Sequence, residues 1–362
     1  MGSELEQVGW DDHWQRWWKR WSKPHRKLEG LRVARVRRVD RGEVDLIGDD
    51  GPFRARSSPA DAELPRPAFA PATGDWVAAA DDTFVGEDDQ ITVEPALVAI
   101  APRRTELRRR DPSVTHGSQV LATNMDTVLV TEPLDREVNE RRIERALTIA
   151  LDSGAEVALI MTKADRSVDD NPLELARAAA PGVPVILSSV ESGLGLDEVR
   201  ELFRPGQTVA LFGPSGAGKS TLTNVLFGED VAEVGDVRER DRRGLHTTVT
   251  RDLITLPGGG ILIDTPGVRE LGLWDAERGL ALAFVDITDA ATGCRFSDCY
   301  HDNEPGCGVS AAVGAGHLPT RRLDSWRDLH GELTALVEER ERHERTQERR
   351  DAYRSKRRAR RR

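Results

Sequence analysis

A glycine-rich segment at residues 213–221, Gly-Pro-Ser-Gly-Ala-Gly-Lys-Ser-Thr, has the residue types and spacing needed to bind phosphate. Apolar runs precede it at 208–212 and follow it at 222–227, so we expect a strand, a loop and a helix. In that context G-x-x-x-x-G-K-S is the phosphate-binding P-loop: glycines let backbone N–H groups face phosphate oxygens, and the helix N-terminus favours an anion. Lys219 is expected to reach the β- and γ-phosphates, and the Ser220 hydroxyl to ligate Mg²⁺. The predicted phosphate-binding residues are Gly213, Pro214, Ser215, Gly216, Ala217, Gly218, Lys219, Ser220 and Thr221.

Two further loops are predicted to recognise a guanine base. Thr162-Lys163-Ala164-Asp165 follows the apolar segment 155–161, and Ser188-Ser189 follows the apolar segment 183–187. In the N/T-K-x-D element of GTPases the aspartate accepts two N–H groups of guanine, a donor pair that adenine lacks. The four-residue match alone is weak, but both loops follow strands, where α/β proteins bind ligands. The residues expected to bind the base of GTP are Thr162, Lys163, Ala164, Asp165, Ser188 and Ser189.

Segments after the P-loop are predicted to complete the site around Mg²⁺ and the γ-phosphate. Asp264-Thr265-Pro266-Gly267 follows the apolar residues 261–263 and matches the D-x-x-G element. Asp264 is expected to hold the Mg²⁺ shell, and the Gly267 N–H is expected to sense the γ-phosphate. Thr248, in the polar segment before this strand, is expected to close on Mg²⁺.

The residue after this element indicates how hydrolysis is controlled. Val268 cannot hydrogen-bond the attacking water, which a glutamine orients in Ras-like enzymes. We therefore expect slow intrinsic hydrolysis and activation by a partner. His246 is the candidate catalytic residue because an imidazole can orient or deprotonate water. The alternative is that His246 is only a residue of a mobile loop.

The order of these motifs is itself informative. The base-reading loops precede the P-loop, whereas standard GTPases have the opposite order. A circular permutation accounts for this order, because strands that are neighbours in space remain neighbours. It also places the segment after Gly267 directly before the C-terminal region.

The three cysteines of the chain all lie between residues 294 and 307. Together with one histidine they supply three sulfurs and one imidazole, a set suited to tetrahedral structural Zn²⁺ with no open catalytic position. Such clustering argues against a disulfide framework, and the alternative is reduced, buried cysteines. A zinc ion would stabilise a small domain that lacks a large core. The predicted ligands are Cys294, Cys299, His301 and Cys307.

The elements that must position these residues divide into several predicted domains. Residues 31–107 hold about five short β segments separated by turn residues, which predicts an OB-type β-barrel. Residues 102–111 are interpreted as a basic link. Residues 108–273 alternate strands with helices, which predicts a doubly wound α/β domain with a parallel sheet, here a circularly permuted P-loop GTPase. Residues 274–345 are expected to form a zinc-binding α-helical domain.

The two ends are basic although the formal net charge is −10. The extension 1–30 carries five tryptophans at helical spacing, and residues 13–27 hold six Arg or Lys and no acid. This stretch either stacks on RNA or packs its tryptophans on the protein, and we favour packing. Helices are expected at 320–330 and 333–350. The tail 346–362 is expected to be disordered until it meets phosphate.

The remaining composition predicts a soluble protein. No apolar run approaches the roughly 18 residues of a membrane span, and no secretory signal is visible at the start. We expect a cytoplasmic monomer with no membrane partner.

The chain resembles the RsgA/YjeQ family of ribosome small-subunit-dependent GTPases over roughly residues 31–345. The resemblance rests on the permuted order and on five motifs: Gly74-Asp75-Trp76-Val77, Gly-Leu-His-Thr-Thr at 244–248, Asp-Thr-Pro-Gly-Val-Arg-Glu at 264–270, Gly272-Leu273-Trp274, and Cys-x4-Cys-x-His-x2-Glu-Pro-x-Cys at 294–307. It implies an OB domain, a permuted GTPase and a zinc domain. It further implies binding to the 30S subunit and its 16S rRNA late in maturation, ribosome-stimulated hydrolysis of GTP to GDP, and a role for His246.

Two departures and three rival functions accompany this resemblance. Thr162 stands where asparagine is more usual, so guanine affinity is expected to be weaker while Asp165 preserves selectivity; Ser189-Val190 also departs from the common pattern. A nucleotide-gated rRNA-binding assembly factor, in which hydrolysis is incidental, is the main alternative. A GTPase of the large subunit is disfavoured by the barrel and the zinc domain, and an ATPase is disfavoured by Asp165.

Overall fold

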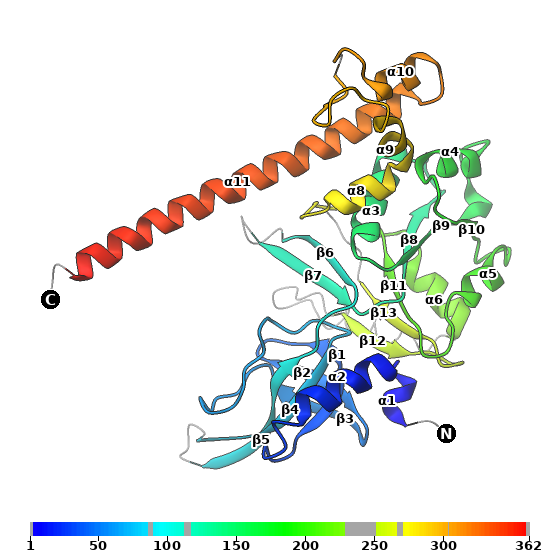
Figure 1. Cartoon of the computed structure of the whole chain (residues 1–362). Helices are drawn as coiled ribbons and strands as arrows, with labels where there is room; N and C mark the ends of the chain where they lie inside the picture. Colours follow the sequence, from blue (N-terminus) through cyan, green and yellow to red (C-terminus); the bar gives the residue numbers. More distant parts are fainter. Residues whose placement is uncertain are drawn as a thin grey trace, which may run out of the picture.

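The computed structural model describes residues 3–85, 90–111, 117–228, 251–265, 271–302 and 304–359. Its central part is a six-stranded sheet with the order β10-β9-β8-β11-β13-β12 (Figure 1). All neighbours are parallel except β12, which runs antiparallel to β13. The strands are β8 Thr127–Pro133, β9 Glu156–Thr162, β10 Val185–Leu187, β11 Thr208–Phe212, β12 Asp252–Thr255 and β13 Ile261–Asp264. The α/β sheet predicted from the alternation of strands and helices is confirmed.

Helices cover both faces of this sheet, which explains why its central strands are continuously apolar. Along β8, Val128 and Val130 belong to one buried cluster and Leu129 belongs to another. The first cluster includes the apolar side of α3, and the second includes residues of α5 and α6. The helices of this part are α3 Glu140–Asp152, the 3₁₀ helix η1 Ala164–Arg166, α4 Pro172–Ala179, α5 Leu196–Glu201 and α6 Lys219–Phe227.

The N-terminal part is a closed barrel with the strand order β1-β2-β3-β5-β4. Alternate residues of each strand point inward, and Val36, Leu46 and Val77 form part of a fully buried interior. The strands are β1 Arg32–Val39, β2 Glu43–Gly48, β3 Gly51–Arg56, β4 Trp76–Val85 and β5 Ile91–Ile100. The predicted barrel is therefore confirmed.

The stretch interpreted as a basic link is partly a strand. Strand β6, Glu106–Arg110, pairs antiparallel with strand β7, Ser118–Thr123. The two strands form a separate ribbon, which joins the barrel to the sheet along the chain (Figure 1). Leu107 is fully buried and pairs with Ala122. The arginines around it dominate the composition, so the sequence signal for this strand is weak.

The C-terminal part consists of α8 Glu277–Ala283, α9 Val285–Ala291, α10 Gly308–Gly314 and α11 Thr320–Ala359. The prediction of two helices followed by a disordered tail is wrong for residues 320–359, because α11 is continuous through them. Gly331 lies inside this helix, and a single glycine costs only about 1 kcal/mol there. Figure 1 shows that α11 projects well beyond the rest of the molecule. Within the described ranges, none of the helices combines the length and apolarity needed to cross a bilayer.

A buried ion-pair network joins α11 to α3, which covers the central sheet, and to α9. The Arg322 guanidinium donates to the Glu144 carboxylate of α3 at 2.9 Å and to the Asp286 carboxylate of α9 at 2.5 Å. Glu144 and Arg322 are 0% and 1% exposed, and the Ser325 hydroxyl also donates to Glu144. A buried charge is tolerated only when its partners remain in place, so this network fixes the start of α11 on α3.

The N-terminal extension packs against the barrel. Helices α1 Glu4–Gln7 and α2 Asp12–Ser22 begin at the N-caps Ser3 and Asp11. Trp14 is 2% exposed and its ring centroid lies 5.9 Å from that of Trp76. The packing interpretation of the tryptophan stripe is confirmed.

Arg35 connects three parts of the chain in the interior. Its guanidinium donates to the carbonyl oxygens of Val8, of Gly74 in the barrel (3.3 Å), and of Asn124 at the start of the sheet (3.1 Å). The side chain is 1% exposed, and burial lowers the pKa of Arg35 to about 10, which leaves it charged at neutral pH. The Val8 and Asn124 carbonyls would lose this donor if Arg35 were replaced, whereas the Gly74 carbonyl also accepts from the Asn124 side-chain amide at 3.1 Å.

The Arg35→Met variant should therefore lose about 3–5 kcal/mol of unfolding free energy, because buried carbonyls are left without donors. Urea denaturation would measure this loss. Arg54→Met is the matched control. Arg54 lies on the same barrel but is half exposed, so solvent screens its ion pairs with Asp40, Glu43 and Asp45, and its loss should be much smaller than that of Arg35→Met. Equal, small losses in both variants would contradict the role assigned to Arg35.

Candidate functional site

The predicted P-loop lies between β11 and α6, at the carboxyl end of the sheet. Gly213 lies so close to β8 that a Cβ there would approach the Thr131 Oγ1 to 2.2 Å, so no other residue fits. Gly218 caps α6 with a φ of 79°, a left-handed conformation that suits glycine. These two glycines let the chain turn sharply and direct its amides toward the start of α6, where an anion is favoured.

Lys219 is held across the P-loop. Its amine donates to the carbonyl oxygens of Gly213 and Pro214, each at 2.9 Å, and the residue is 6% exposed. Burial lowers the pKa of the Lys219 amine, while the charge of Asp264 opposes that shift. A buried amine that bonds only neutral carbonyls favours the approach of an anion such as phosphate. Ser220 and Thr221, at the beginning of α6, are exposed.

Asp264 lies beside the P-loop at the end of β13. It is paired in register with Leu211 of β11, and the Thr265 hydroxyl donates to the Leu211 carbonyl. Burial raises the pKa of the Asp264 carboxyl, Lys219 opposes this shift and Asp252 adds to it. A carboxylate that is destabilised by burial gains from a cation, and Asp264 and the Ser220 hydroxyl are oxygen ligands of the kind that Mg²⁺ prefers.

The first base-reading loop is joined directly to the P-loop. The Thr162 hydroxyl, at the end of β9, donates to the Ala217 carbonyl at 2.7 Å. Lys163 has a left-handed φ of 56°, and its amine contacts the Asp135 carboxylate at 2.5 Å. Its stem passes the P-loop, since a Cβ on Gly218 would lie 3.9 Å from the Lys163 Cε. The Thr162 hydroxyl therefore makes a link between the two loops although the asparagine amide is missing.

Asp165 and the second base-reading loop are also in contact. The Ser189 hydroxyl donates to the Asp165 Oδ1 at 2.5 Å and accepts from the Ser192 N–H at 3.2 Å. The hydrogen bond from Ser189 lowers the pKa of the Asp165 carboxyl, which keeps it ionised as an acceptor. The backbone also joins the loops, because the Ala164 N–H donates to the Ser188 carbonyl at 3.0 Å.

A cavity of about 230 Å³ lies between these loops and the start of α6. Thr162, Asp165, Ser188 and Gly218 are among its lining residues. Ser188 is 1% exposed, and its hydroxyl has no hydrogen-bond partner among the residues that the structure describes. The backbone N–H groups of Ser188 and Ser189 already donate to the carbonyls of Met161 and Leu194. The Ser188 hydroxyl, of a residue that the sequence pattern predicted to bind the base, is thus a donor available in the cavity wall.

Three predicted site residues lie outside the described ranges. His246 and Thr248 fall within 229–250, and Gly267 falls within 266–270. The other predicted phosphate, base and Mg²⁺ residues come together at one edge of the sheet, between β9, β10, β11 and β13.

The predicted zinc ligands also come together. One ligand atom from each of Cys294, Cys299, His301 and Cys307 lies within 4.8 Å of all the others. The Cys294 and Cys307 sulfurs are 3.9 Å apart, and each is 3.6 Å from the His301 Nδ1. A tetrahedral zinc with bonds of about 2.0–2.3 Å separates its ligand atoms by about 3.5–3.8 Å, so this donor set fits Zn²⁺.

Surrounding groups orient the four ligands. The Gly308 N–H donates to the Cys294 sulfur, and the Ser310 N–H donates to the Cys307 sulfur, each at 3.3 Å. The Glu304 carboxylate accepts the Tyr300 and Asp302 N–H groups on either side of His301. N–H donation to sulfur favours the thiolate form that binds metal.

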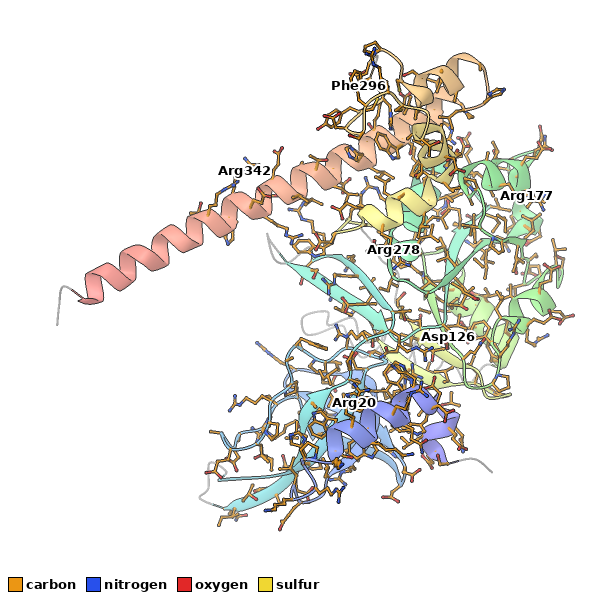
Figure 2. All side chains as sticks on the ribbon, viewed as in Figure 1. Arg20, Asp126, Arg177, Arg278, Phe296 and Arg342 are labelled. Carbon is orange, nitrogen blue, oxygen red and sulfur yellow. The ribbon has the colours of Figure 1, made fainter. Side chains whose placement is uncertain are left out.

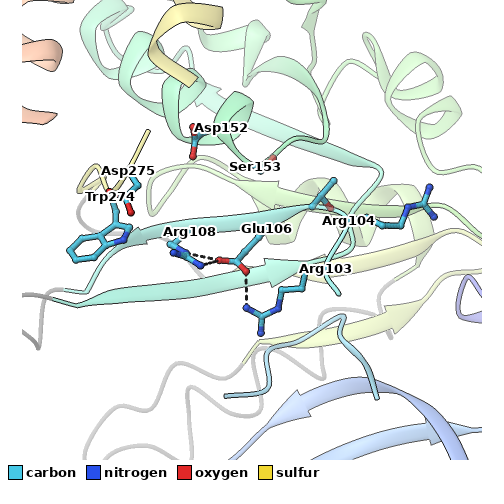
Figure 3. Close-up of a pocket in the computed structure, with 9 residues that line it drawn as sticks. Arg103, Arg104, Glu106, Arg108, Asp152, Ser153, Trp274 and Asp275 are labelled. Carbon is cyan, nitrogen blue, oxygen red and sulfur yellow. Dashed lines mark hydrogen bonds and ion pairs between the residues drawn. The ribbon is translucent and has the colours of Figure 1, made fainter. Parts of the chain in front are cut away.

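A second cavity, of about 280 Å³, lies where β6 meets α3 and residues Trp274 and Asp275 (Figure 3). It is rich in arginine, but Arg103 and Arg108 both pair with Glu106 inside it. Arg103 also pairs with Asp75, which is buried. These cations are compensated within the protein, so the cavity is a weaker anion site than the P-loop.

The chain is similar in sequence to known proteins over most of its length. A profile of the RsgA GTPase family matches residues 100–274. A protein named small ribosomal subunit biogenesis GTPase RsgA from Streptomyces coelicolor is 42% identical over 349 residues, which cover 92% of this chain and 88% of the relative. The protein of that name from Methanosarcina acetivorans is 42% identical over 265 residues, with 73% and 70% covered.

Solved structures agree on the fold. YjeQ from Thermotoga maritima superimposes with a TM-score of 0.57 at 23% identity, over 84% of this chain and 99% of that one. YloQ, described as a circularly permuted GTPase, gives a TM-score of 0.57 at 20% identity, over 86% and 98%. With the barrel, the permuted order of nucleotide loops and the Cys3His cluster, these comparisons show that the chain belongs to the RsgA family of GTPases.

Proposed function

We propose that this chain hydrolyses GTP to GDP while bound to the 30S ribosomal subunit, and so assists the late maturation of that subunit. The observation that carries the proposal is the direct contact between the base-reading loops and the P-loop, made by the Thr162–Ala217 hydrogen bond at 2.7 Å. The cavity of about 230 Å³ between these loops and the start of α6 supports the proposal, because a base bound in it would lie next to the P-loop residues Gly218 and Thr221. The names of the curated relatives supply the subunit, and the basic ends of the chain are suited to its 16S rRNA.

Each residue of the site has a defined part in this reaction. Asp165, ionised and oriented by Ser189, accepts the two guanine donors. The P-loop amides and Lys219 hold the β- and γ-phosphates. Ser220, Asp264 and Thr248 would hold Mg²⁺, which neutralises phosphate charge when it is bound. Gly267 contacts the γ-phosphate, and His246 orients the attacking water.

The Cys3His cluster is proposed to hold one structural Zn²⁺. The described part of the C-terminal segment has short helices, α8, α9 and α10, joined by loops, so metal ligation would supply stability that a small core does not. We further propose that the protein acts as a cytoplasmic monomer.

Steady-state GTP hydrolysis tests the main proposal. The protein alone should turn over slowly, and 30S subunits should stimulate it by roughly tenfold or more, whereas 50S subunits or ATP should give no comparable rate. Lys219→Ala should abolish nucleotide-dependent turnover. His246→Ala should still bind GTP but lose the stimulated rate. If 30S subunits bind without stimulating hydrolysis, the chain is instead a nucleotide-gated rRNA-binding factor.

The free donor in the cavity wall gives a test of base recognition. We expect the Ser188 hydroxyl to donate to the guanine O6, so Ser188→Ala should weaken GTP binding by about five- to tenfold. A 2-aminopurine nucleotide, which lacks O6, should bind the wild type and the variant equally. Isothermal titration with both nucleotides would measure this difference. If both nucleotides lose the same affinity, Ser188 acts only on the structure of the loop.

Metal analysis tests the zinc proposal. Purified protein should contain about one zinc per chain, and a chelator or Cys294→Ser should remove it and lower the melting temperature of the C-terminal part. Ser297→Ala, an exposed change in the same loop, should leave the zinc content unchanged. GTP binding should persist in all these samples because the P-loop belongs to the separate sheet. The proposal would be refuted if the purified wild type contained no zinc and if the chelator left its melting curve unchanged.

A further inference from the structure

The exposed side of α2 and of the turn after it carries cations without ion-pair partners. Six Arg or Lys lie between residues 16 and 27, and all six are exposed. Among the residues that the structure describes, no carboxylate forms an ion pair with any of them. They are Arg16, Lys19, Arg20, Lys23, Arg26 and Lys27. Two of them, Lys19 and Arg20, lie in the last turn of α2, where the helix dipole favours cations. That effect leaves the other four unexplained.

Several cations on the barrel strands are paired with carboxylates. Arg54 contacts three carboxylates, Arg38 pairs with Asp40, and Arg56 pairs with the buried Asp82. The chain has a net charge of −10, so acids were available to neutralise α2 as well. A concentrated run of unneutralised cations on one helix is the electrostatic signature of a surface for a polyanion.

The apolar side of α2 is already covered by the protein. Trp14 packs on Trp76, and Trp17 and Trp21 pack against the outer surface of β4 and β5 around Ala78 and Val98. A helix that binds a lipid bilayer must bury its apolar face in the membrane. That face is not available here, so the charges of α2 favour a nucleic acid over a membrane.

A cavity of about 580 Å³ adjoins the cation run. It lies between α1, α2, β1 and the turn that joins β2 to β3, and Lys19 belongs both to its rim and to the cation run. Trp10, Trp18 and Phe53 supply aromatic walls, and the Arg32 guanidinium lies 4.7 Å from the Phe53 ring centroid. Its volume is within the range of small-molecule sites, about 300–1,000 Å³.

The two features together identify a ligand class. Phosphates contact exposed cations, and bases stack on aromatic rings. An unpaired base can rotate out of its stack into a cavity without breaking a base pair, whereas a base in a duplex cannot. Asp49 and Asp50, on the turn at the far side of the cavity, can accept the exocyclic amines of such a base. A duplex would satisfy the cations but would leave the aromatic walls unused.

We propose that α2 and this cavity form a binding site for single-stranded RNA, with the backbone phosphates on the cation run and one base stacked between Trp18 and Phe53. The inference rests on the proposed function only in taking RNA as the natural polyanion. It adds a contact surface on the barrel side of the molecule, where Arg20 is labelled in Figure 2.

Fluorescence anisotropy with a labelled single-stranded RNA of about twelve nucleotides tests the site, with the matching duplex and phosphatidylserine vesicles as competitors. The double variant Lys19→Glu with Lys23→Glu should lose about tenfold or more in affinity. The slope of log affinity against log salt concentration should become less steep by about 1.4, because each phosphate contact to a single strand contributes about 0.7 to that slope. The control Arg177→Glu with Arg204→Glu makes the same charge change on exposed residues of the GTPase part and should bind as the wild type does.

Phe53→Leu tests the cavity separately, because loss of one stacked base should lower single-strand affinity by about fivefold or more and leave duplex affinity unchanged. Far-UV circular dichroism and intrinsic GTP hydrolysis would confirm that the variants are folded. Unchanged RNA binding in the charge-reversed variant would overturn the proposal, as would vesicles that compete better than the single strand. Ribosome-stimulated hydrolysis that persists unchanged in that variant would overturn the site and leave the proposed function intact.

Discussion

The arrangement of the molecule depends on one buried cation. The Arg35 guanidinium bonds the Val8 carbonyl of the N-terminal extension, the Gly74 carbonyl of the barrel and the Asn124 carbonyl at the entrance to the sheet. A planar group with five donors can hold three backbone segments at once, which lysine could not do in the same way. Burial lowers its pKa, and the nearby carboxylates of Asp126, Asp75 and Asp11 oppose that shift, so the charge is retained in the interior. The barrel and the sheet therefore meet through a polar junction with a fixed geometry.

A second junction, between α3, α9 and α11, uses the same chemistry. Glu144 of α3, fully buried, accepts from Arg321, Arg322 and Ser325 of α11, and Arg322 continues to Asp286 of α9. Neither junction resembles a simple apolar interface. Buried charges of this kind add little net stability but penalise any other arrangement of the parts, because a displaced partner would leave a charge without compensation. The chain thus keeps its barrel, its GTPase sheet and its C-terminal helices in definite positions.

Much of the nucleotide site could be predicted from the sequence, because the P-loop and the base-reading loops are local motifs whose backbone needs specific residue types. Glycine at 213 is required by its approach to Thr131, which no spacing rule reports but which the motif already contains. The ribbon of β6 and β7 was not predicted, since its arginines mask the single buried residue, Leu107, that fixes its register. The continuity of α11 was also missed, since helices were expected at 320–330 and 333–350, whereas the structure has one helix through Thr320–Ala359. Long-range contacts such as Arg35 with Asn124, 89 residues apart, leave no periodic signal at all.

The contacts that flank the predicted γ-phosphate segments explain why the permuted order matters. On one side, the Thr73 hydroxyl of the barrel donates to the Arg251 carbonyl, immediately after the segment that contains Thr248. On the other side, the segment that contains Gly267 is followed by the Leu271 carbonyl, which accepts from Arg145, and by the Gly272 carbonyl, which accepts from the Arg110 N–H of β6. Arg145 also pairs with Glu332 of α11, and Arg340 of α11 lies over the Trp274 ring. Arg251, on β12's side of the sheet, is therefore tied to the barrel, and Leu271 and Gly272 are tied to α3 and β6, with α11 bonded to Arg145 and stacked on Trp274. The permuted order thus joins the described residues that flank the nucleotide motifs to the barrel on one side and to the C-terminal part on the other.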